Sequence, residues 1–219
     1  MTQDPRPHNA RVWNYWLGGT DNYPADRQAG DHVAGMFPGI VAVARANRAF
    51  LGRAVRYLTA EAGVRQFLDL GSGLPSAGAT HEVAADAVPG GAGAGLRVVY
   101  MDNDPLVLAH SRGLLGGAAP GVARYLHGDL RDPGEIVRQA GTALDFGRPV
   151  GLLMLGVPAS SERMVPSWAS YRTAAQMRGV PASVVTCGCL KTSGSKTREP
   201  ARCAFPKRVS PGSKRTFLR

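Results

Sequence analysis

Apolar residues recur at helical spacing in the first third of the chain and then give way to short continuous runs. One face of a predicted helix over residues 41–58 carries five positions spaced three or four residues apart: Val43, Asn47, Phe50, Ala54 and Leu58. Gly63 suits the end of that helix, because glycine adopts left-handed backbone angles at low cost. Residues 66–70 then form an apolar run ending at a glycine, which is typical of a buried parallel strand.

Strands and helices continue to alternate as far as residue 155. Strands are predicted at residues 96–101, 123–127 and 150–155, and the second of these is weak. Helices are predicted over residues 80–87, 105–115 and 133–140. This alternation indicates an α/β protein with a Rossmann-like parallel sheet and helices on both of its faces.

The periodic pattern ends after Val157. Residues 158–219 are rich in Ser, Pro, Gly, Arg and Lys, and only the pair Val184–Val185 is apolar enough for a strand. We therefore expect the sheet to lack its last strands and to leave the fourth as an exposed, aggregation-prone edge. The predicted organisation is a helical lid over residues 1–64, a core with four strands over 65–157 and a basic tail over 158–219.

Charge divides the chain at the same place. Residues 1–157 contain 14 arginines, no lysine and 14 acidic residues, so their formal charge is zero. Residues 158–219 contain 12 basic and 2 acidic residues and carry the whole net charge of +10, together with every lysine and cysteine. A shifted reading frame would produce this abrupt change, and we hypothesise that residues 158–219 are out of frame. Translating the other two frames downstream of codon 157 tests this.

Composition also narrows the class of partner. The basic residues that could contact nucleic acid all lie in the tail, where a shifted frame or an extension is the simpler explanation, so a nucleic-acid partner is not expected. The N-terminus lacks a secretory signal, and no stretch approaches the roughly 18 apolar residues of a membrane span, so we expect a cytoplasmic protein. Cys187, Cys189 and Cys203 lack Cys-x-x-Cys spacing, and neither a disulfide framework nor a metal site is expected.

The residues that follow the first predicted strand form a glycine loop. Asp69, Gly71 and Gly73 stand in the pattern acid-x-Gly-x-Gly, in which the backbone can turn sharply and approach a ligand closely. A dinucleotide-binding fingerprint would need a third glycine at position 76, where the chain has Ser76. The pattern instead resembles the first motif of S-adenosylmethionine-dependent methyltransferases, in which the loop passes under the methionine part of the cofactor.

Acidic residues also follow the second and third predicted strands. Asp102 ends the second strand, where a carboxylate can accept hydrogen bonds from both hydroxyls of a ribose. Asp129 follows the third strand, where it or the nearby backbone can recognise an adenine amino group; a turn or a helix cap is the alternative. The carboxyl ends of parallel strands share one edge of a sheet, so these tips are expected to form one adenosyl pocket.

Several segments together resemble a bacterial family of proposed S-adenosyl methyltransferases with an N-terminal Leu-Gly-Gly-x-x-Asn signature. These segments are ARVWNYWLGGTDNYPAD, NRAFLGRAVRYL, QFLDLGSGLP and VVYMDNDPLVLAHSR, and the resemblance runs from about residue 7 to about residue 157. It implies a class I methyltransferase fold with S-adenosylmethionine as cofactor. It also implies a set of residues that line this cofactor: Gly71, Ser72, Gly73, Asp102, Asn103, Asp129 and Leu130. Asp69 would orient the loop or hold the cofactor's ammonium group.

The same resemblance implies that the N-terminal segment covers the cofactor. Four of its residues are candidates for contacting the methionine carboxylate or the substrate: Tyr15, Asn22, Tyr23 and Arg27. Trp13 and Trp16 are interpreted as packing residues, and Asp104 as a helix cap that precedes Pro105. Family members continue beyond the fourth strand with a histidine-containing segment and three more strands, from which this chain departs.

The sequence thus predicts a methyltransferase that acts on an unidentified small molecule. Residues that select the acceptor usually follow the fourth strand, so the acceptor is not inferred and no catalytic base is assigned. Isolated histidines such as His81, His110 and His127 are more often surface or packing residues. The alternatives are a non-catalytic S-adenosylmethionine-binding protein and a basic nucleic-acid-binding protein, and titration with the cofactor helps to separate them.

Overall fold

The computed structural model describes residues 6–88, 95–114, 121–155 and 184–188. Three helices come first: α1 (Asn9–Trp16), α2 (Pro24–Met36) and α3 (Ile40–Ala60). Strands and helices then alternate: β1 (Gln66–Leu70), α4 (Thr80–Ala87), β2 (Arg97–Asp102), α5 (Pro105–Leu114), β3 (Ala123–His127), α6 (Pro133–Ala140), β4 (Val150–Met154) and β5 (Val184–Gly188). Every element predicted between residues 41 and 155 is confirmed, with bounds that differ by at most two residues.

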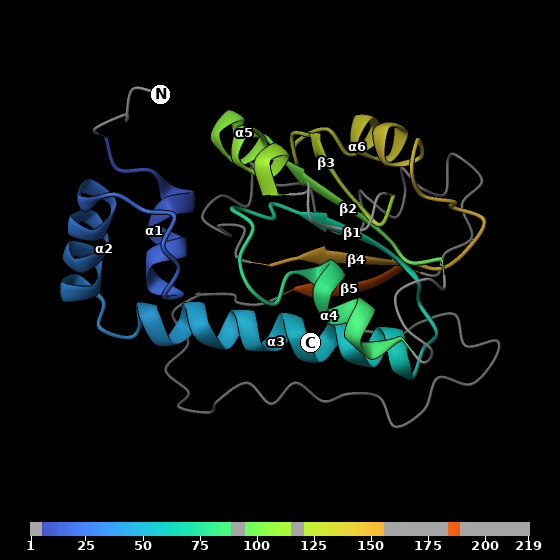
Figure 1. Ribbon diagram of the computed structural model, residues 1–219, viewed down its shortest axis with the longest axis horizontal. Coiled ribbons are helices and arrows are strands. Elements are labelled where there is room, and N and C mark those ends of the chain that lie inside the picture. Colours follow the sequence, from blue (N-terminus) through green and yellow to red (C-terminus); the bar gives the residue numbers. More distant parts are fainter. Residues whose placement is uncertain (1–5, 89–94, 115–120, 156–183, 189–219) are drawn as a thin grey trace.

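All strand pairs in the sheet are parallel, and the strand order is β3-β2-β1-β4-β5. Strand β1 is central, and all five of its residues are buried. The chain winds outward from β1 through β2 to β3 and then crosses to the other side of β1, where β4 and β5 lie (Figure 1). Ligands of such sheets bind beyond the carboxyl ends of the strands at the point where the winding direction reverses, here between β1 and β4.

Strand β5 corrects two sequence predictions. We expected no regular element after Val157, but Val184–Gly188 pairs with β4 along its whole length, from Val150 opposite Val184 to Met154 opposite Gly188. The fourth strand is therefore not the exposed edge that we expected. The short run Val184–Val185 was the available signal, and it was too brief to distinguish a strand from a chance apolar pair. The rest of the predicted tail, residues 158–183 and 189–219, lies outside the described residues.

Two apolar layers cover the two faces of the sheet. Helices α3 and α4 pack on one face, where Phe50, Leu58 and Val83 surround Phe67 of β1. Helix α6 packs on the opposite face, where Ile136 and Ala140 meet apolar side chains of β1, β2 and β4. Figure 1 shows α5 and α6 on one side of the sheet and α3 and α4 on the other. The prediction of a Rossmann-like parallel sheet with helices on both faces is confirmed.

The predicted helical lid divides into two parts with different surroundings. Helix α3 belongs to the core that covers the sheet, whereas α1 and α2 stand beyond the strand tips (Figure 1). These two helices are joined by a buried ion pair, in which Arg11 Nε lies 2.7 Å from Asp26 Oδ2. Burial alone would raise the pKa of Asp26, but hydrogen bonds from Arg11 and from the backbone N–H groups of Tyr23 and His8 lower this pKa overall.

Candidate functional site

A cavity of about 290 Å³ lies at the carboxyl ends of the strands, beneath helix α1. This volume is close to the lower end of the range of small-molecule sites, about 300–1,000 Å³. Seven of the predicted cofactor residues line the cavity: Asp69, Gly71, Ser72, Gly73, Asp102, Asn103 and Leu130. Residues that follow β1, β2 and β3 thus meet at one cavity, and Leu155 after β4 also contributes.

The glycine loop after β1 is fixed to the end of β2. Gly71 and Gly73 have φ angles of 67° and 65°, in the left-handed region that favours glycine. The N–H of Gly71 donates to the carbonyl of Met101 at 2.8 Å, and the N–H of Gly73 donates to Asp102 Oδ2 at 3.0 Å. The two strand tips therefore hold each other in place, and the loop needs its glycines for this geometry.

Asp102 combines a structural role with a free face toward the cavity. Its Oδ2 accepts the Gly73 N–H, and its Oδ1 accepts the N–H of Asp104 at 3.1 Å. Each carboxylate oxygen can accept a second hydrogen bond, and Asp102 lines the cavity, so acceptor capacity remains for two hydroxyl groups. Asp104 in turn accepts the Leu106 N–H at 2.9 Å, which confirms its predicted role as a helix cap.

Asp69 places a buried carboxyl group in the cavity wall. Only 7% of the residue is exposed, and its Oδ2 accepts a hydrogen bond from Thr80 Oγ1 at 2.7 Å. Burial raises the pKa of Asp69 from its ordinary value of 3.8 to about 6, while Thr80 and the charge of Arg48 oppose this rise and the charge of Asp102 adds to it. The carboxyl group is ionised at neutral pH at a cost in free energy, and a cation in the cavity would reduce that cost.

Arg48 of helix α3 was not among the predicted site residues. Its Nη2 donates to the carbonyl groups of Ser76 and Ala77 at 3.0 and 3.1 Å, which anchors the far end of the glycine loop. Its Nε is buried and has no hydrogen-bond partner in the described part of the chain, and the same holds for Ser72 Oγ. Both residues line the cavity. Because buried polar groups are nearly always paired, these two atoms fit a polar ligand.

Helix α1 forms the outer wall of the cavity. Five of its residues or near neighbours contribute: Asn9, Ala10, Trp13, Asn14 and Leu17. Their spacing of three or four residues puts them on one helix face. Trp16 packs with Val12 and Ala44, as expected, but Trp13 lines the cavity instead of serving only in packing.

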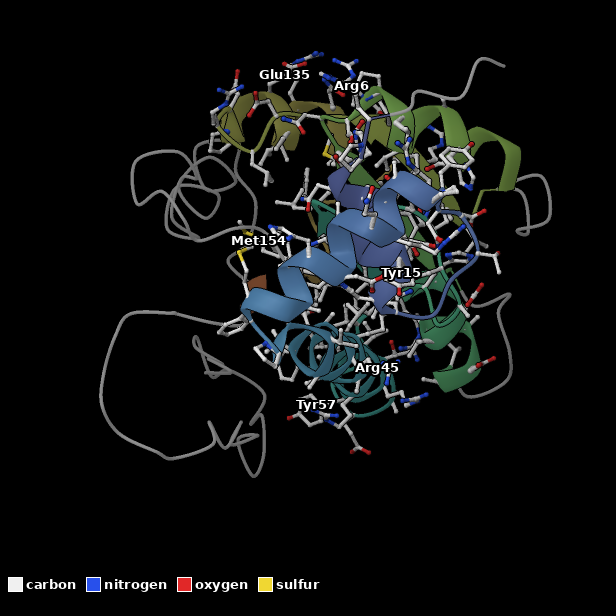
Figure 2. All side chains as sticks on the ribbon, turned by 90° about the vertical axis from the view of Figure 1, so that its left-hand side faces the viewer. Arg6, Tyr15, Arg45, Tyr57, Glu135 and Met154 are labelled. Atoms are coloured by element: carbon white, nitrogen blue, oxygen red, sulfur yellow. The ribbon has the colours of Figure 1, made fainter. Side chains whose placement is uncertain are left out.

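The other predicted lid residues lie outside the cavity wall. Tyr15, which is labelled in Figure 2, is not among the residues that line the cavity; its hydroxyl donates to Asp31 of helix α2 at 2.8 Å. The guanidinium carbon of Arg11 lies over the ring of Tyr23, 4.9 Å from the centre of that ring. Asn22 and Arg27 are hydrogen-bonded within the N-terminal segment. The residues that helix α1 contributes to the cavity wall include Trp13 and Asn14, on another face of the helix than Tyr15.

Asp129 also lies outside the cavity wall, although its neighbour Leu130 is part of it. The Asp129 carboxylate accepts hydrogen bonds from the side chain and the backbone N–H of Arg131. The bond from the Arg131 side chain is the main reason why the pKa of Asp129 falls to about 2. The Asp129 carboxylate thus forms the turn that we considered as the alternative, and Leu130 is the neighbouring residue that lines the cavity.

The described residues contain no group of three or more His, Cys, Asp or Glu side chains that could hold a metal ion. In the same part of the chain, no helix has both the length and the apolar character needed to cross a membrane. His81, His110 and His127 do not line the cavity. His81 and His110 instead face Tyr100 and Asp21.

The parallel sheet has the order β3-β2-β1-β4-β5, with a glycine loop after β1 and Asp102 at the end of β2. These features define a Rossmann-like protein with a site of the kind that binds nucleoside cofactors. The chain belongs to the S-adenosyl methyltransferase family, which matches residues 2–161. The match ends close to the composition break after Val157. The family prediction is therefore confirmed.

Two crystal structures are similar to this chain. One is a proposed methyltransferase from Thermobifida fusca, with 36% identity over 83% of this chain and 65% of that chain and a TM-score of 0.69. The other is a DUF574 family protein from Streptomyces avermitilis, with 42% identity over 68% of this chain and 56% of that chain and a TM-score of 0.60. This chain thus spans between half and two thirds of their lengths. None of the curated proteins matches it.

Proposed function

We propose that this protein binds S-adenosylmethionine in the cavity beneath helix α1 and transfers its methyl group to a small-molecule acceptor. The observation that carries this proposal is the composition of the cavity wall. Asp102 offers acceptors for a ribose. The buried carboxyl group of Asp69 lines the same space, as does the guanidinium of Arg48, whose Nε has no partner among the described residues. A nucleoside with a zwitterionic amino-acid group is the matching ligand.

Each part of the cofactor has a candidate partner in the wall. Asp102 accepts hydrogen bonds from the ribose hydroxyls, and Asn103 and Leu130 lie where the adenine would be held. The loop Gly71–Gly73 allows the methionine part to approach the backbone. Asp69 neutralises the ammonium group, directly or through the loop, and Arg48 donates from Nε to the carboxylate.

The chain's own contribution to the reaction is to position groups and exclude water. Bound S-adenosylmethionine would supply an electrophilic methyl group on a sulfonium, and the acceptor atom must approach it in line. Helix α1 covers the cavity with Trp13 and Leu17, and this cover limits the entry of water. No described residue of the wall is assigned as a general base, since no histidine lines the cavity.

Calorimetric titration with S-adenosylmethionine and S-adenosylhomocysteine tests the binding half of the proposal. We expect micromolar binding to the wild type and at least a hundredfold weaker binding after Asp102→Ala, which removes the ribose partner and the anchor of Gly73. Asp86→Ala is the matched control, because Asp86 is an exposed acid on helix α4 outside the cavity. A wild type that binds neither nucleoside would refute the proposal.

A second candidate is an S-adenosylmethionine-binding protein without transferase activity. It is favoured by one observation: the match to the family covers residues 2–161 and does not extend into residues 162–219. Formation of S-adenosylhomocysteine over a broad panel of small acceptors distinguishes the two candidates, because cofactor binding without turnover would favour the second. The basic residues behind the nucleic-acid alternative lie in 158–219, almost wholly outside the described residues.

A further inference from the structure

A chain of hydrogen bonds leads from the surface of helix α2 to the wall of the cavity. Arg27 Nη1 donates to Asn22 Oδ1 at 2.9 Å and to the Asn22 carbonyl at 3.2 Å. Asn22 Nδ2 donates to Asn14 Oδ1 at 3.0 Å and to the carbonyl of Gly19 at 2.8 Å. Asn14 lines the cavity, whereas Asn22 and Arg27 do not.

Two contacts of Asn22 fix which atoms donate and which accept in this series of hydrogen bonds. A guanidinium can only donate, so the atom of Asn22 that faces Arg27 must be its oxygen. A backbone carbonyl can only accept, so the atom of Asn22 that faces Gly19 must be its nitrogen. Asn22 therefore donates from its Nδ2 to Asn14, and the atom of Asn14 that accepts this hydrogen bond must be its oxygen. The Nδ2 amide of Asn14 is left as a donor, and no acceptor among the described residues binds it.

Gly19 completes the arrangement. A Cβ atom at position 19 would lie 2.4 Å from Asn14 Nδ2 and 2.6 Å from its Cγ, so the carboxamide packs flat against a glycine. Gly18, with a φ angle of +81°, makes the turn that ends helix α1. Two residues of the Leu-Gly-Gly-x-x-Asn signature, Gly19 and Asn22, thus contact the side chain of Asn14.

The position of Asn14 along helix α1 indicates what it faces. The segment before the helix lies at the β2 side of the cavity, where His8 Nε2 is 3.0 Å from Asp104 Oδ2. The end of the helix lies against α3, where Trp16 packs on Ala44 (Figure 1). Helix α3 also carries Arg48, the one basic side chain of the described cavity wall. An anionic group of the ligand is therefore expected at the end of α1 that carries Asn14.

We propose that Asn14 Nδ2 donates a hydrogen bond to the same ligand carboxylate that Arg48 binds, and that Asn22 and Arg27 are positioning residues that keep this donor turned inward. This inference rests on the proposed function, because the carboxylate is that of the cofactor's methionine. A carboxamide in the opposite orientation would present its oxygen to that carboxylate and repel it.

The test compares two variants and two probes on the full chain. Asn14→Asp keeps the acceptor that Asn22 needs but replaces the inward donor by an oxygen. Asn22→Asp keeps the acceptor for Arg27, beside which its charge lies, but forces Asn14 to turn its nitrogen outward. Gln28→Glu is the control, since it adds the same charge at an exposed position of helix α2. The probes are S-adenosylhomocysteine, which has the carboxylate, and methylthioadenosine, which does not.

We expect both variants to bind S-adenosylhomocysteine about ten- to a hundredfold more weakly than the wild type, which is the range for loss of one hydrogen bond to a charged group. Methylthioadenosine should bind all four proteins equally. Equal weakening of both probes would mean general damage to the lid and would overturn the assignment. If Asn14→Asp fails to fold, as judged by its melting curve, Asn22→Asp decides.

Other outcomes separate the parts of the inference. Wild-type affinity of both variants for S-adenosylhomocysteine would overturn the assignment alone, with the proposed function intact. Loss of affinity in Asn14→Asp but not in Asn22→Asp would overturn the positioning role of Asn22 and Arg27. A wild type that binds neither probe would overturn the proposed function, and this assignment with it.

Discussion

Replacing Asp69 by asparagine should change the pH dependence of stability in a defined direction. The carboxyl group is buried, and its pKa in the folded protein is about 6 instead of 3.8. A folded pKa above the unfolded one means that the folded state holds the proton more tightly. The ionised carboxylate therefore destabilises the fold, and this destabilisation grows as the pH rises from about 4 to above 6.

The size of this destabilisation follows from the two pKa values of Asp69, about 6 in the folded protein and 3.8 in the unfolded chain. One pKa unit corresponds to about 1.4 kcal/mol, so ionised Asp69 costs about 3 kcal/mol of folding free energy at pH 7.5 and roughly half of that at pH 5. Asparagine keeps an acceptor for Thr80 Oγ1 and cannot ionise. The stability of Asp69→Asn relative to wild type should thus improve by about 1.5 kcal/mol between pH 5 and pH 7.5, whatever constant cost the new amide adds.

Urea unfolding of both proteins at pH 5, 6 and 7.5 measures this difference. Asp86→Asn, at an exposed acid of helix α4, serves as control and should show no such trend. A stability difference between Asp69→Asn and wild type that is independent of pH, or that shrinks as the pH rises, would refute the reasoning. The affinity of the wild type for the cationic cofactor should rise over the same pH range, while that of Asp69→Asn should stay low and flat.

Three further predictions concern single contacts. Arg48→Gln should weaken S-adenosylhomocysteine binding at least tenfold in calorimetry, whereas Arg45→Gln, at a surface position of the same helix (Figure 2), should leave it unchanged. Gly19→Ala should also weaken that binding at least tenfold, because its Cβ would displace the carboxamide of Asn14. Gly151→Ala should lower stability by about 1–3 kcal/mol in urea unfolding, because its Cβ would lie 2.7 Å from the buried ring of Phe67. Unchanged values in Arg48→Gln, Gly19→Ala or Gly151→Ala would contradict the corresponding contact.

Most of the core could be predicted because its signals are local. The mainly apolar run QFLDL ends directly at Gly71, which is typical of a parallel strand that is buried on both faces. Asp102 could be placed because a residue that ends a parallel strand must lie at the shared edge of the sheet. Such positions follow from the chain's own order and need no knowledge of distant contacts.

The residues that sequence reasoning missed depend on orientation between elements. Nothing local distinguishes Arg48 from Arg45, Arg53 and Arg56 on the same helix; only the packing of α3 under the glycine loop does. The one available signal was Asn47, a polar residue within an apolar stripe, which also lines the cavity. Sequence alone could not single out Asn14 on helix α1, because the face that this helix turns toward the strands is set by the packing of Val12 and Trp16 on Ala44.

Three groups in the cavity wall lower the stability of the fold. Ionised Asp69 is buried, and Arg48 Nε and Ser72 Oγ are buried without partners among the described residues. Buried charges and unpaired buried polar atoms destabilise a protein core, and they are expected mainly at functional sites. A ligand that supplies a cation to Asp69 and acceptors to Arg48 and Ser72 would remove all three costs at once. Binding should therefore raise the melting temperature, and Asp69→Asn, which removes one cost in advance, should show a smaller rise at equal cofactor concentration.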